Sequence, residues 1–360
     1  MASRSATLVE RLGLRAPILQ SPMAGVSTPQ MAAAVSNAGG LGALGIGAAS
    51  VEQAAEMLHQ TRAITDRPIN INAFCHRPAI SDDVVEAAWL ERLSPIFHCY
   101  NSVPPQELRE IYTSFVVDTD MQALLVKERP AVVSFHFGLP ETNVIEQLQE
   151  VGCLLFATAT SVEEAGQLVA AGIDAIVAQG WEAGGHRGIF DPASPDTRLN
   201  TIPLIRQLVE CTDLPLIAAG GIMTGADIAQ ALAAGATAAQ LGTAFIACPE
   251  SSADAGYRAA LLADAPTTEM IAAISGRPAR CLTNKFTAWA QANTDADIPE
   301  YPITYDAGKA LNAAAKSVGD WGYGAQWAGQ GAARARALPA AELMDVLFAE
   351  LDAAESATTR

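Results

Sequence analysis

The stretch Leu216-Ile-Ala-Ala-Gly-Gly-Ile-Met-Thr-Gly-Ala-Asp227 holds the pattern that decides the fold. A short apolar run ends in two glycines, and a threonine that can cap a helix follows. An apolar run without polar alternation is typical of a strand that is covered on both faces, as in a parallel sheet. The next unit repeats this arrangement, since Ala238-Ala-Gln-Leu241 precedes Gly242 and Thr243.

Six further apolar runs with intervening helix-like segments precede this pair, so the sequence predicts an α/β fold, a (β/α)₈ TIM barrel. The alternative is an open doubly wound sheet. The glycines of Gly40-Leu-Gly42-Ala-Leu-Gly45 match its dinucleotide pattern but begin a strand instead of following one, which disfavours that alternative. The predicted strands are residues 17–20, 41–44, 69–72, 131–135, 154–157, 175–178, 216–219 and 238–241. The predicted helices are residues 28–37, 51–65, 141–151, 162–171, 201–211 and 225–234.

Two segments do not fit the barrel repeat. We assign residues 1–72 and 131–248 to the barrel, and residues 73–130 to an insertion after the third strand. The insertion is expected to fold as extra helices over the rim, at residues 82–93, 104–115 and 121–127. Residues 249–360 are predicted to form a C-terminal extension of helix and loop, which acts as a lid and contributes to the substrate site or forms a homodimer contact.

Composition excludes several classes of function. The chain has 360 residues, a net charge of −17 and no basic run, which argues against a nucleic-acid surface. No apolar stretch is long enough to span a membrane, so we expect a cytoplasmic protein. The six cysteines lack close pairs and the histidines lack ligand spacing, so we expect free thiols and no metal site.

The carboxyl ends of barrel strands meet at one mouth, where the sequence predicts a phosphate site. Gly220 and Gly221 allow backbone N–H groups to approach an anion, and Gly242 and Thr243 add further donors. The helix that opens at Thr224 would present its positive end. Neither loop contains Lys or Arg, so the phosphate would be held by dipoles and hydrogen bonds.

One unit earlier, Glu182-Ala-Gly-Gly-His186-Arg-Gly188 carries a titratable ring. Gly184, Gly185 and Gly188 permit close backbone approach to a planar ligand, although a histidine on a loop is often only a hydrogen-bonded surface residue. His136 ends the fourth strand and is expected to form a wall of the same mouth. The polar strand ends suit the amide-like edge of a flavin; they are Gln20, Asn72 and Gln179.

Together these motifs closely resemble the nitronate monooxygenases, also called 2-nitropropane dioxygenases. The resemblance spans roughly residues 15–330, and the cysteine- and histidine-bearing motifs resemble class I of the family. The motifs are Ser21-Pro-Met-Ala-Gly25, Val35-Ser-Asn-Ala-Gly-Gly-Leu-Gly42, Asn72-Ala-Phe-Cys-His76, Val133-Ser-Phe-His-Phe-Gly138, Glu182-Ala-Gly-Gly-His-Arg-Gly188 and Ala219-Gly-Gly-Ile222.

The resemblance implies a barrel that binds FMN without a covalent bond, and it implies roles for particular residues. His186 would be the catalytic residue. The residues expected to contact FMN are Met23, Ala24, Asn72, Gln179, Gly184, Gly185, Gly220, Gly221, Gly242, Thr243 and Gln330. The residues expected on the substrate side are Tyr112, His136, Tyr301, Tyr305 and Lys309.

The resemblance further implies the oxidative denitrification of alkyl nitronates such as propionate 3-nitronate. Oxygen would be the second substrate, a flavin semiquinone the intermediate, and an aldehyde or oxo acid plus nitrite the products. Two alternatives remain open, because fold alone does not decide function. One is an FMN-dependent NAD(P)H:quinone or enoyl-thioester reductase, and the other is a non-enzymatic flavin- or phosphate-binding sensor.

Overall fold

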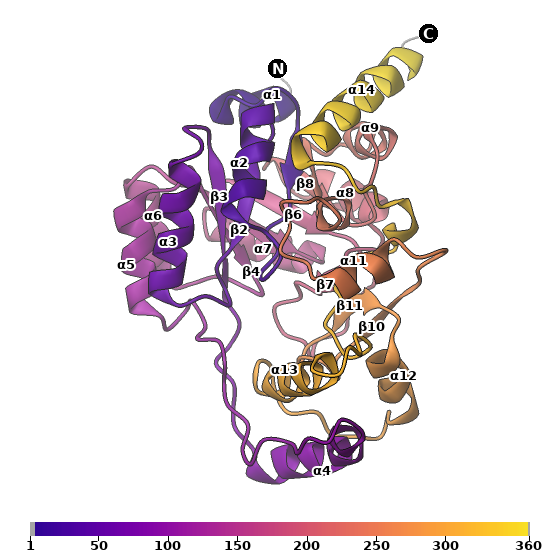
Figure 1. Cartoon of the computed structure of the whole chain (residues 1–360). Helices are drawn as coiled ribbons and strands as arrows, with labels where there is room; N and C mark the ends of the chain where they lie inside the picture. Colours follow the sequence, from indigo (N-terminus) through magenta and orange to yellow (C-terminus); the bar gives the residue numbers. More distant parts are fainter. Residues whose placement is uncertain (1–3, 359–360) are drawn as a thin grey trace.

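The computed structural model of the chain describes residues 4–358, and its centre is a barrel of parallel strands (Figure 1). The eight-stranded sheet has the order β1-β9-β8-β6-β5-β4-β3-β2. A parallel bridge between Leu19 and Leu41 joins its two ends, and the N–H of Leu41 donates to the carbonyl of Ile18 over 3.1 Å. The barrel is therefore closed, which confirms the predicted fold and excludes the open sheet. The strands are β1 Ile18–Gln20, β2 Gly42–Gly45, β3 Ile69–Phe74, β4 Val132–His136, β5 Leu154–Ala159, β6 Ala175–Gln179, β8 Leu216–Ala219 and β9 Ala238–Leu241.

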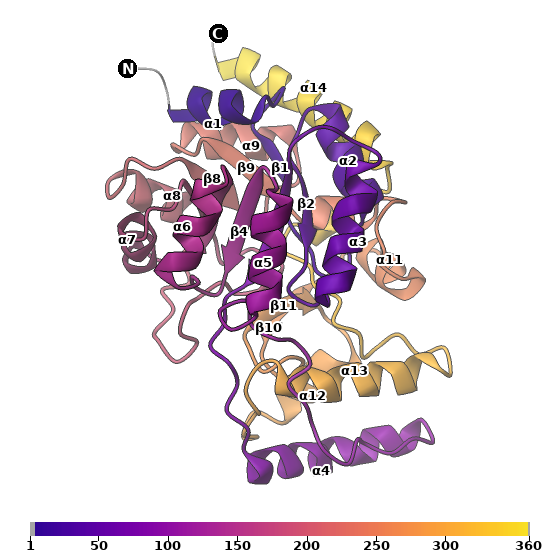
Figure 2. The ribbon, with the colours of Figure 1, turned by 90° about the vertical axis from the view of Figure 1, so that its left-hand side faces the viewer.

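Helices cover the outside of the barrel, and several lie side by side in Figure 2. Many begin at a residue whose side chain caps the first turn, as Ser50, Ser161 and Thr224 do. The helices of this layer in sequence order are α2 Pro29–Ala38, α3 Val51–Arg62, α5 Thr119–Glu128, α6 Thr142–Glu150, α7 Val162–Ala170, α8 Thr201–Val209 and α9 Gly225–Ala233. Helix α1, Arg4–Leu12, places Leu8 and Leu12 in the apolar cluster of Leu19, Leu41 and Val132.

The last helix, α14 (Ala340–Thr358), returns to the barrel and packs against both α9 and α2. The contact with α9 is close, because a Cβ atom on Gly225 would lie 2.2 Å from the backbone nitrogen of Leu351. Met344 and Leu347 of α14 are fully buried there. The C-terminal segment therefore completes the helical layer of the barrel as well as reaching its mouth.

The insertion after β3 leaves the barrel as one long helix, α4 (Asp83–Cys99), at the bottom of Figures 1 and 2. The helix predicted over residues 104–115 is wrong, since this stretch has no regular structure and is tied to β3 by the hydrogen bond from Phe115 N–H to the carbonyl of Phe74. Residues 121–127 lie in α5, which contacts α3 and α6 in the barrel layer.

The chain after residue 249 contains strands as well as the predicted helices. Strand β11 (Ala279–Leu282) pairs antiparallel with β10 (Thr268–Ile271) and with the two-residue strand β7 (Gly185–His186). The sequence analysis expected only helix and loop after residue 249 and a loop at His186. Strand β7 was missed because its partner β11 lies about ninety residues away, which no local pattern reveals, and the local hairpin of β10 and β11 was not recognised in the sequence.

Helix α13 (Ile303–Lys316) packs on α4, so the insertion and the C-terminal extension form one body over the barrel mouth. Large aromatic and aliphatic side chains fill the contact between them; they include Trp89, Phe97, Phe286, Ile303 and Leu311. The short helix α10, Thr243–Ile246, follows β9 in the barrel segment, and the other elements of the extension are α11 Ala255–Leu261, α12 Lys285–Ala292 and the short 3₁₀ helix Ala332–Arg334.

Candidate active site

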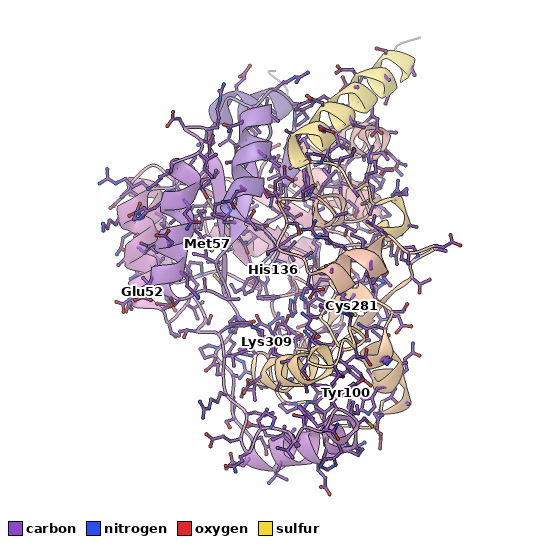
Figure 3. The ribbon with its side chains drawn as sticks, in the orientation of Figure 1. Glu52, Met57, Tyr100, His136, Cys281 and Lys309 are labelled. Carbon is purple, nitrogen blue, oxygen red and sulfur yellow. The ribbon has the colours of Figure 1, made fainter. Side chains whose placement is uncertain are left out.

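A cavity of about 980 Å³ opens at the carboxyl ends of the barrel strands, between the barrel and α13. Figure 3 shows His136 on the barrel side of this space and Lys309 on the α13 side. The predicted site residues that line it are Met23, Ala24, Asn72, Tyr112, His136, Gln179, Gly184, Gly185, His186, Gly220, Gly221, Gly242, Thr243, Tyr301, Tyr305 and Lys309. Gln330 is the exception, because its side chain is exposed and outside the cavity lining.

The two glycine loops after β8 and β9 form one end of the cavity. Gly220 and Gly221 have φ angles of +123° and +71°, a region that favours glycine. A Cβ atom on Gly220 would also lie 2.8 Å from the hydroxyl of Thr201. Gly242 faces Ser21 and Met23, and a Cβ atom there would lie 3.3 Å from Oγ of Ser21. These loops bring backbone atoms directly to the cavity surface.

The amino end of α9 differs from the prediction. Asp227 Oδ2 accepts hydrogen bonds from the N–H groups of Met223 and Thr224, and Glu350 accepts one from Gly225. Carboxylates of the chain itself therefore occupy this helix end. Arg334 of the extension donates to the carbonyl of Gly221, so a cation lies beside the loop although the loop sequence contains none.

His186 lies at the other end of the cavity, on β7, within a group of aromatic side chains. The distance from its ring centre is 5.0 Å to that of Trp327, 5.2 Å to Tyr301 and 5.7 Å to Phe137. Burial lowers the pKa of His186 well below its usual value, and the nearby positive charge of Arg277 lowers it further. Without an anionic ligand, the ring is therefore neutral near pH 7.

The loop that carries His186 is held from behind by two polar side chains. Gln179 donates from Nε2 to the carbonyl of His186 over 3.0 Å and accepts from Gly188 N–H over 2.8 Å. Nε2 of His136 lies 3.2 Å from the same carbonyl, and its Nδ1 lies 2.9 Å from Thr158 Oγ1. Because a carbonyl only accepts, His136 carries its hydrogen on Nε2. Burial lowers the pKa of His136 to about 4.

The amides at the ends of β1 and β3 are also engaged with the barrel. Asn72 donates from Nδ2 to the carbonyl and the hydroxyl of Ser134. Gln20 is fully buried and exchanges hydrogen bonds with the backbone of Ala43, and it does not line the cavity. The prediction that Gln20 offers a polar edge to a ligand is wrong, whereas Asn72 and Gln179 lie on the cavity wall.

Tyrosine and lysine side chains form the wall opposite the barrel. The ammonium of Lys309 lies 4.7 Å above the ring of Tyr112 and 5.5 Å from that of Tyr305. Burial lowers the pKa of Lys309, and no carboxylate lies within ion-pair distance of it in the part of the chain that the structure describes. Lys309 is thus an exposed cation of the cavity lining that is available to an anionic ligand.

Three further residues of the site could not be found from local sequence patterns. Ser275 hydrogen-bonds to His186, Trp327 packs on its ring, and Arg277 is buried without an ion pair, 4.3 Å above the ring of Phe137. All three lie in the extension, and only the pairing of β7 with β11 brings them to His186. Across residues 4–358, no group of three or more His, Cys, Asp or Glu side chains is arranged to hold a metal ion.

The sequence profile of the nitronate monooxygenase family matches residues 5–350 of the chain. The chain belongs to this family. It is 58% identical over 345 residues to the nitronate monooxygenase of Paraburkholderia phytofirmans, which covers 96% of this chain and 94% of the relative. The resemblance to the nitronate monooxygenases, a family of oxidoreductases, is thereby confirmed, and the protein is an enzyme.

Solved structures agree with the barrel assignment. The nitroalkane oxidase of Streptomyces ansochromogenes is 39% identical and superposes with a TM-score of 0.88 over 98% of this chain and 99% of that one. FabK of Thermotoga maritima is 26% identical, with a TM-score of 0.74 over 100% of this chain and 99% of that one. Within residues 4–358, no helix is both long enough and apolar enough to cross a membrane.

Proposed function

We propose that the protein binds FMN in the cavity and oxidises alkyl nitronates of the propionate 3-nitronate type with O₂, giving an aldehyde or oxo acid and nitrite. The observation that carries this proposal is the geometry of the cavity. Glycine loops form one end, His186 forms the other, and the unpaired cation of Lys309 lies on the wall between barrel and extension. Family membership supports oxidation of nitronates as the reaction class.

The residues present fit a flavin phosphate. The nearest atoms to a Cβ on Gly242 would belong to Ser21 and Met23, and a Cβ on Gly185 would meet Trp327 at 4.0 Å. All of these residues line the cavity, so side chains at the two glycines would take up ligand space. A cavity of about 980 Å³ leaves room for a tricyclic ligand and a small substrate.

The backbone donors of Gly221, Gly242 and Thr243 would hold the phosphate, and Asn72 and Gln179 would lie along the ring system. Bound FMN supplies the electron acceptor, and the protein supplies binding, orientation and electrostatics. His186 would hydrogen-bond the nitro group of the substrate. The aromatic side chains around it exclude water from that end of the cavity.

Lys309 would orient the substrate by attracting the carboxylate at the far end of the substrate's alkyl chain. A carboxylate on the alkyl chain would lie near the ammonium, while the nitronate end faces His186. The rings of Tyr112 and Tyr305 hold the lysine chain in place. The cation offsets the repulsion that a chain of net charge −17 would otherwise exert on a dianionic substrate.

The proposed site of action is the cytoplasm. All six cysteines are free thiols, and four of them are buried. Free cysteines of this kind fit a reducing compartment, although they do not identify it alone.

The test is nitrite release by the purified, FMN-loaded protein. With propionate 3-nitronate in air, we expect nitrite formation with matching O₂ consumption and no requirement for NADPH. NADPH oxidation coupled to a quinone or an enoyl thioester, without nitrite from the nitronate, would instead establish the reductase. Flavin binding with neither activity would establish the sensor.

A further inference from the structure

The hydroxyl of Ser275 links His186 to the backbone of the C-terminal extension. Oγ of Ser275 lies 2.9 Å from Nε2 of His186 and 3.2 Å from the carbonyl oxygen of Arg277, to which it donates. Ser275 is completely buried. Its neighbourhood is rigid, because Ser275 N–H donates to Ala272 and Arg187 N–H donates to Pro278.

A serine hydroxyl has one hydrogen, so the direction of that hydrogen decides whether the oxygen donates to the histidine ring or accepts from it. If that hydrogen points to the carbonyl of Arg277, the oxygen can only accept from the ring, and His186 must carry a hydrogen on Nε2. Nδ1 makes no hydrogen bond within residues 4–358, and the residue lines the cavity. Nδ1 is therefore the nitrogen left for a ligand.

We propose that Ser275 is a positioning residue that fixes a hydrogen on Nε2 of His186, so that Nδ1 is the atom at which the ring gains or loses a proton. The neutral ring then presents a lone pair to the cavity. The protonated ring presents an N–H donor to a nitronate oxygen, and Ser275 accepts the Nε2 hydrogen in both states. The position of the hydrogen on His186 is independent of the proposed function, and only the kinetic consequences rest on that function.

Within residues 4–358, Nε2 of His186 has no hydrogen-bond partner other than Ser275. The titratable and charged groups around His186 are His76 beyond β3, His136 at the end of β4, Arg277 before β11, Tyr301 just before α13, and Tyr305 of α13. The two other histidines and the arginine disfavour a charged ring. Ser275 partly offsets this effect, because its oxygen accepts a hydrogen bond from Nε2 of the charged ring. It accepts the same bond from the neutral ring that carries its hydrogen on Nε2.

The direct test is ¹⁵N NMR of the FMN-loaded protein labelled in its five histidines, with the His186→Asn variant used to assign the signal. We expect a protonated Nε2 and an unprotonated Nδ1 at pH 8. A hydrogen on Nδ1 in the wild-type protein would overturn the proposal. This readout needs no turnover, so it stands or fails separately from the proposed reaction.

Variants at position 275 test the kinetic consequence. Ser275→Ala should lower kcat/KM with a nitronate roughly 10- to 100-fold, since it removes a hydrogen bond to a charged group. It should also move the pH profile to lower pH, because loss of the acceptor lowers the pKa of the ring. Ser275→Thr keeps the hydroxyl and should restore the wild-type profile. An unchanged profile in a folded, FMN-bound Ser275→Ala protein would contradict the proposal.

Discussion

At the scale of single residues, the account depends on His186. Its ring is placed by backbone pairing, by the bonds that Gln179 and His136 make to its carbonyl, and by Ser275. The sequence was sufficient to place His186 at the cavity, because three glycines surround it. It was insufficient to predict the neutral state of the ring, which depends on burial and on Arg277, about ninety residues away.

Replacing His186 by Asn should lower kcat/KM for nitronates by about 10²- to 10⁴-fold, the range expected for loss of a proton-active group. FMN should remain bound, because the phosphate loops lie at the other end of the cavity. Nitrite release and flavin content measure the two effects. His59→Asn is the matched control, since that ring is on the surface. Wild-type turnover in His186→Asn would remove the ring from the mechanism.

Lys309→Met should raise KM for a carboxylate-bearing nitronate about tenfold, because it removes the cation of the cavity lining that would face the carboxylate. KM for an uncharged alkyl nitronate should change little. Lys127→Met, in an exposed position on α5, is the control. Equal effects on KM for both substrates would show that Lys309 does not bind the carboxylate of the substrate.

The same lysine predicts a pH dependence. Burial lowers the pKa of Lys309, so the ammonium loses its proton at a lower pH than an exposed lysine does. KM for the carboxylate-bearing substrate should therefore rise as pH is raised through this lowered pKa. The preference over an uncharged nitronate should decline in parallel, and in Lys309→Met this decline should be absent.

At the scale of elements, the barrel strands were predicted closely because buried parallel strands are apolar runs ended by glycine. The strands β7, β10 and β11 were missed. The two residues of β7 are glycine and histidine, whose intrinsic preference for strands is weak, so the partner β11 decides the conformation. The helix wrongly predicted at residues 104–115 is an irregular segment that contacts α13, where Arg109 N–H donates to Asp306.

The loop after β9 offers an element-scale test. Gly242→Val should weaken FMN retention by at least tenfold while the fold is kept, because its φ of −107° suits any residue and the added atoms would enter the cavity. Fluorescence titration with FMN measures this. Gly166→Ala is the control, since nothing lies within 4 Å of an added Cβ on α7. It should leave FMN binding unchanged and stabilise the protein by about 0.5–1 kcal/mol. Unchanged FMN affinity in Gly242→Val would place the phosphate elsewhere.

At the scale of the whole molecule, the C-terminal extension has two roles. Its middle part packs on α4 and forms a wall of the cavity, and its end, α14, completes the barrel layer between α9 and α2. The sequence indicated that the repeat stops after residue 249 and predicted a lid or a homodimer contact there, but no return to the barrel. That the chain returns to the first helices could not be predicted from local patterns, since the contact depends on the three-dimensional closure of the barrel.

Leu347→Ala tests this second role. Leu347 is fully buried in α14, so the substitution should lower the free energy of unfolding by about 2–5 kcal/mol through lost burial and a residual cavity. Urea unfolding followed by circular dichroism measures the change. Leu262→Ala, at a side chain that is 45% exposed, should have a much smaller effect. If Leu347→Ala and Leu262→Ala lowered the free energy of unfolding equally little, the packing of α14 would not contribute to the stability of the barrel.

The central claim is that a flavin in this cavity accepts electrons from a nitronate. Anaerobic stopped-flow absorbance of the FMN-loaded protein tests it most directly, with propionate 3-nitronate in one experiment and NADPH in the other. The account predicts a rapid change of the flavin spectrum with the nitronate and none of comparable rate with NADPH. Rapid bleaching by NADPH with no response to the nitronate would contradict it.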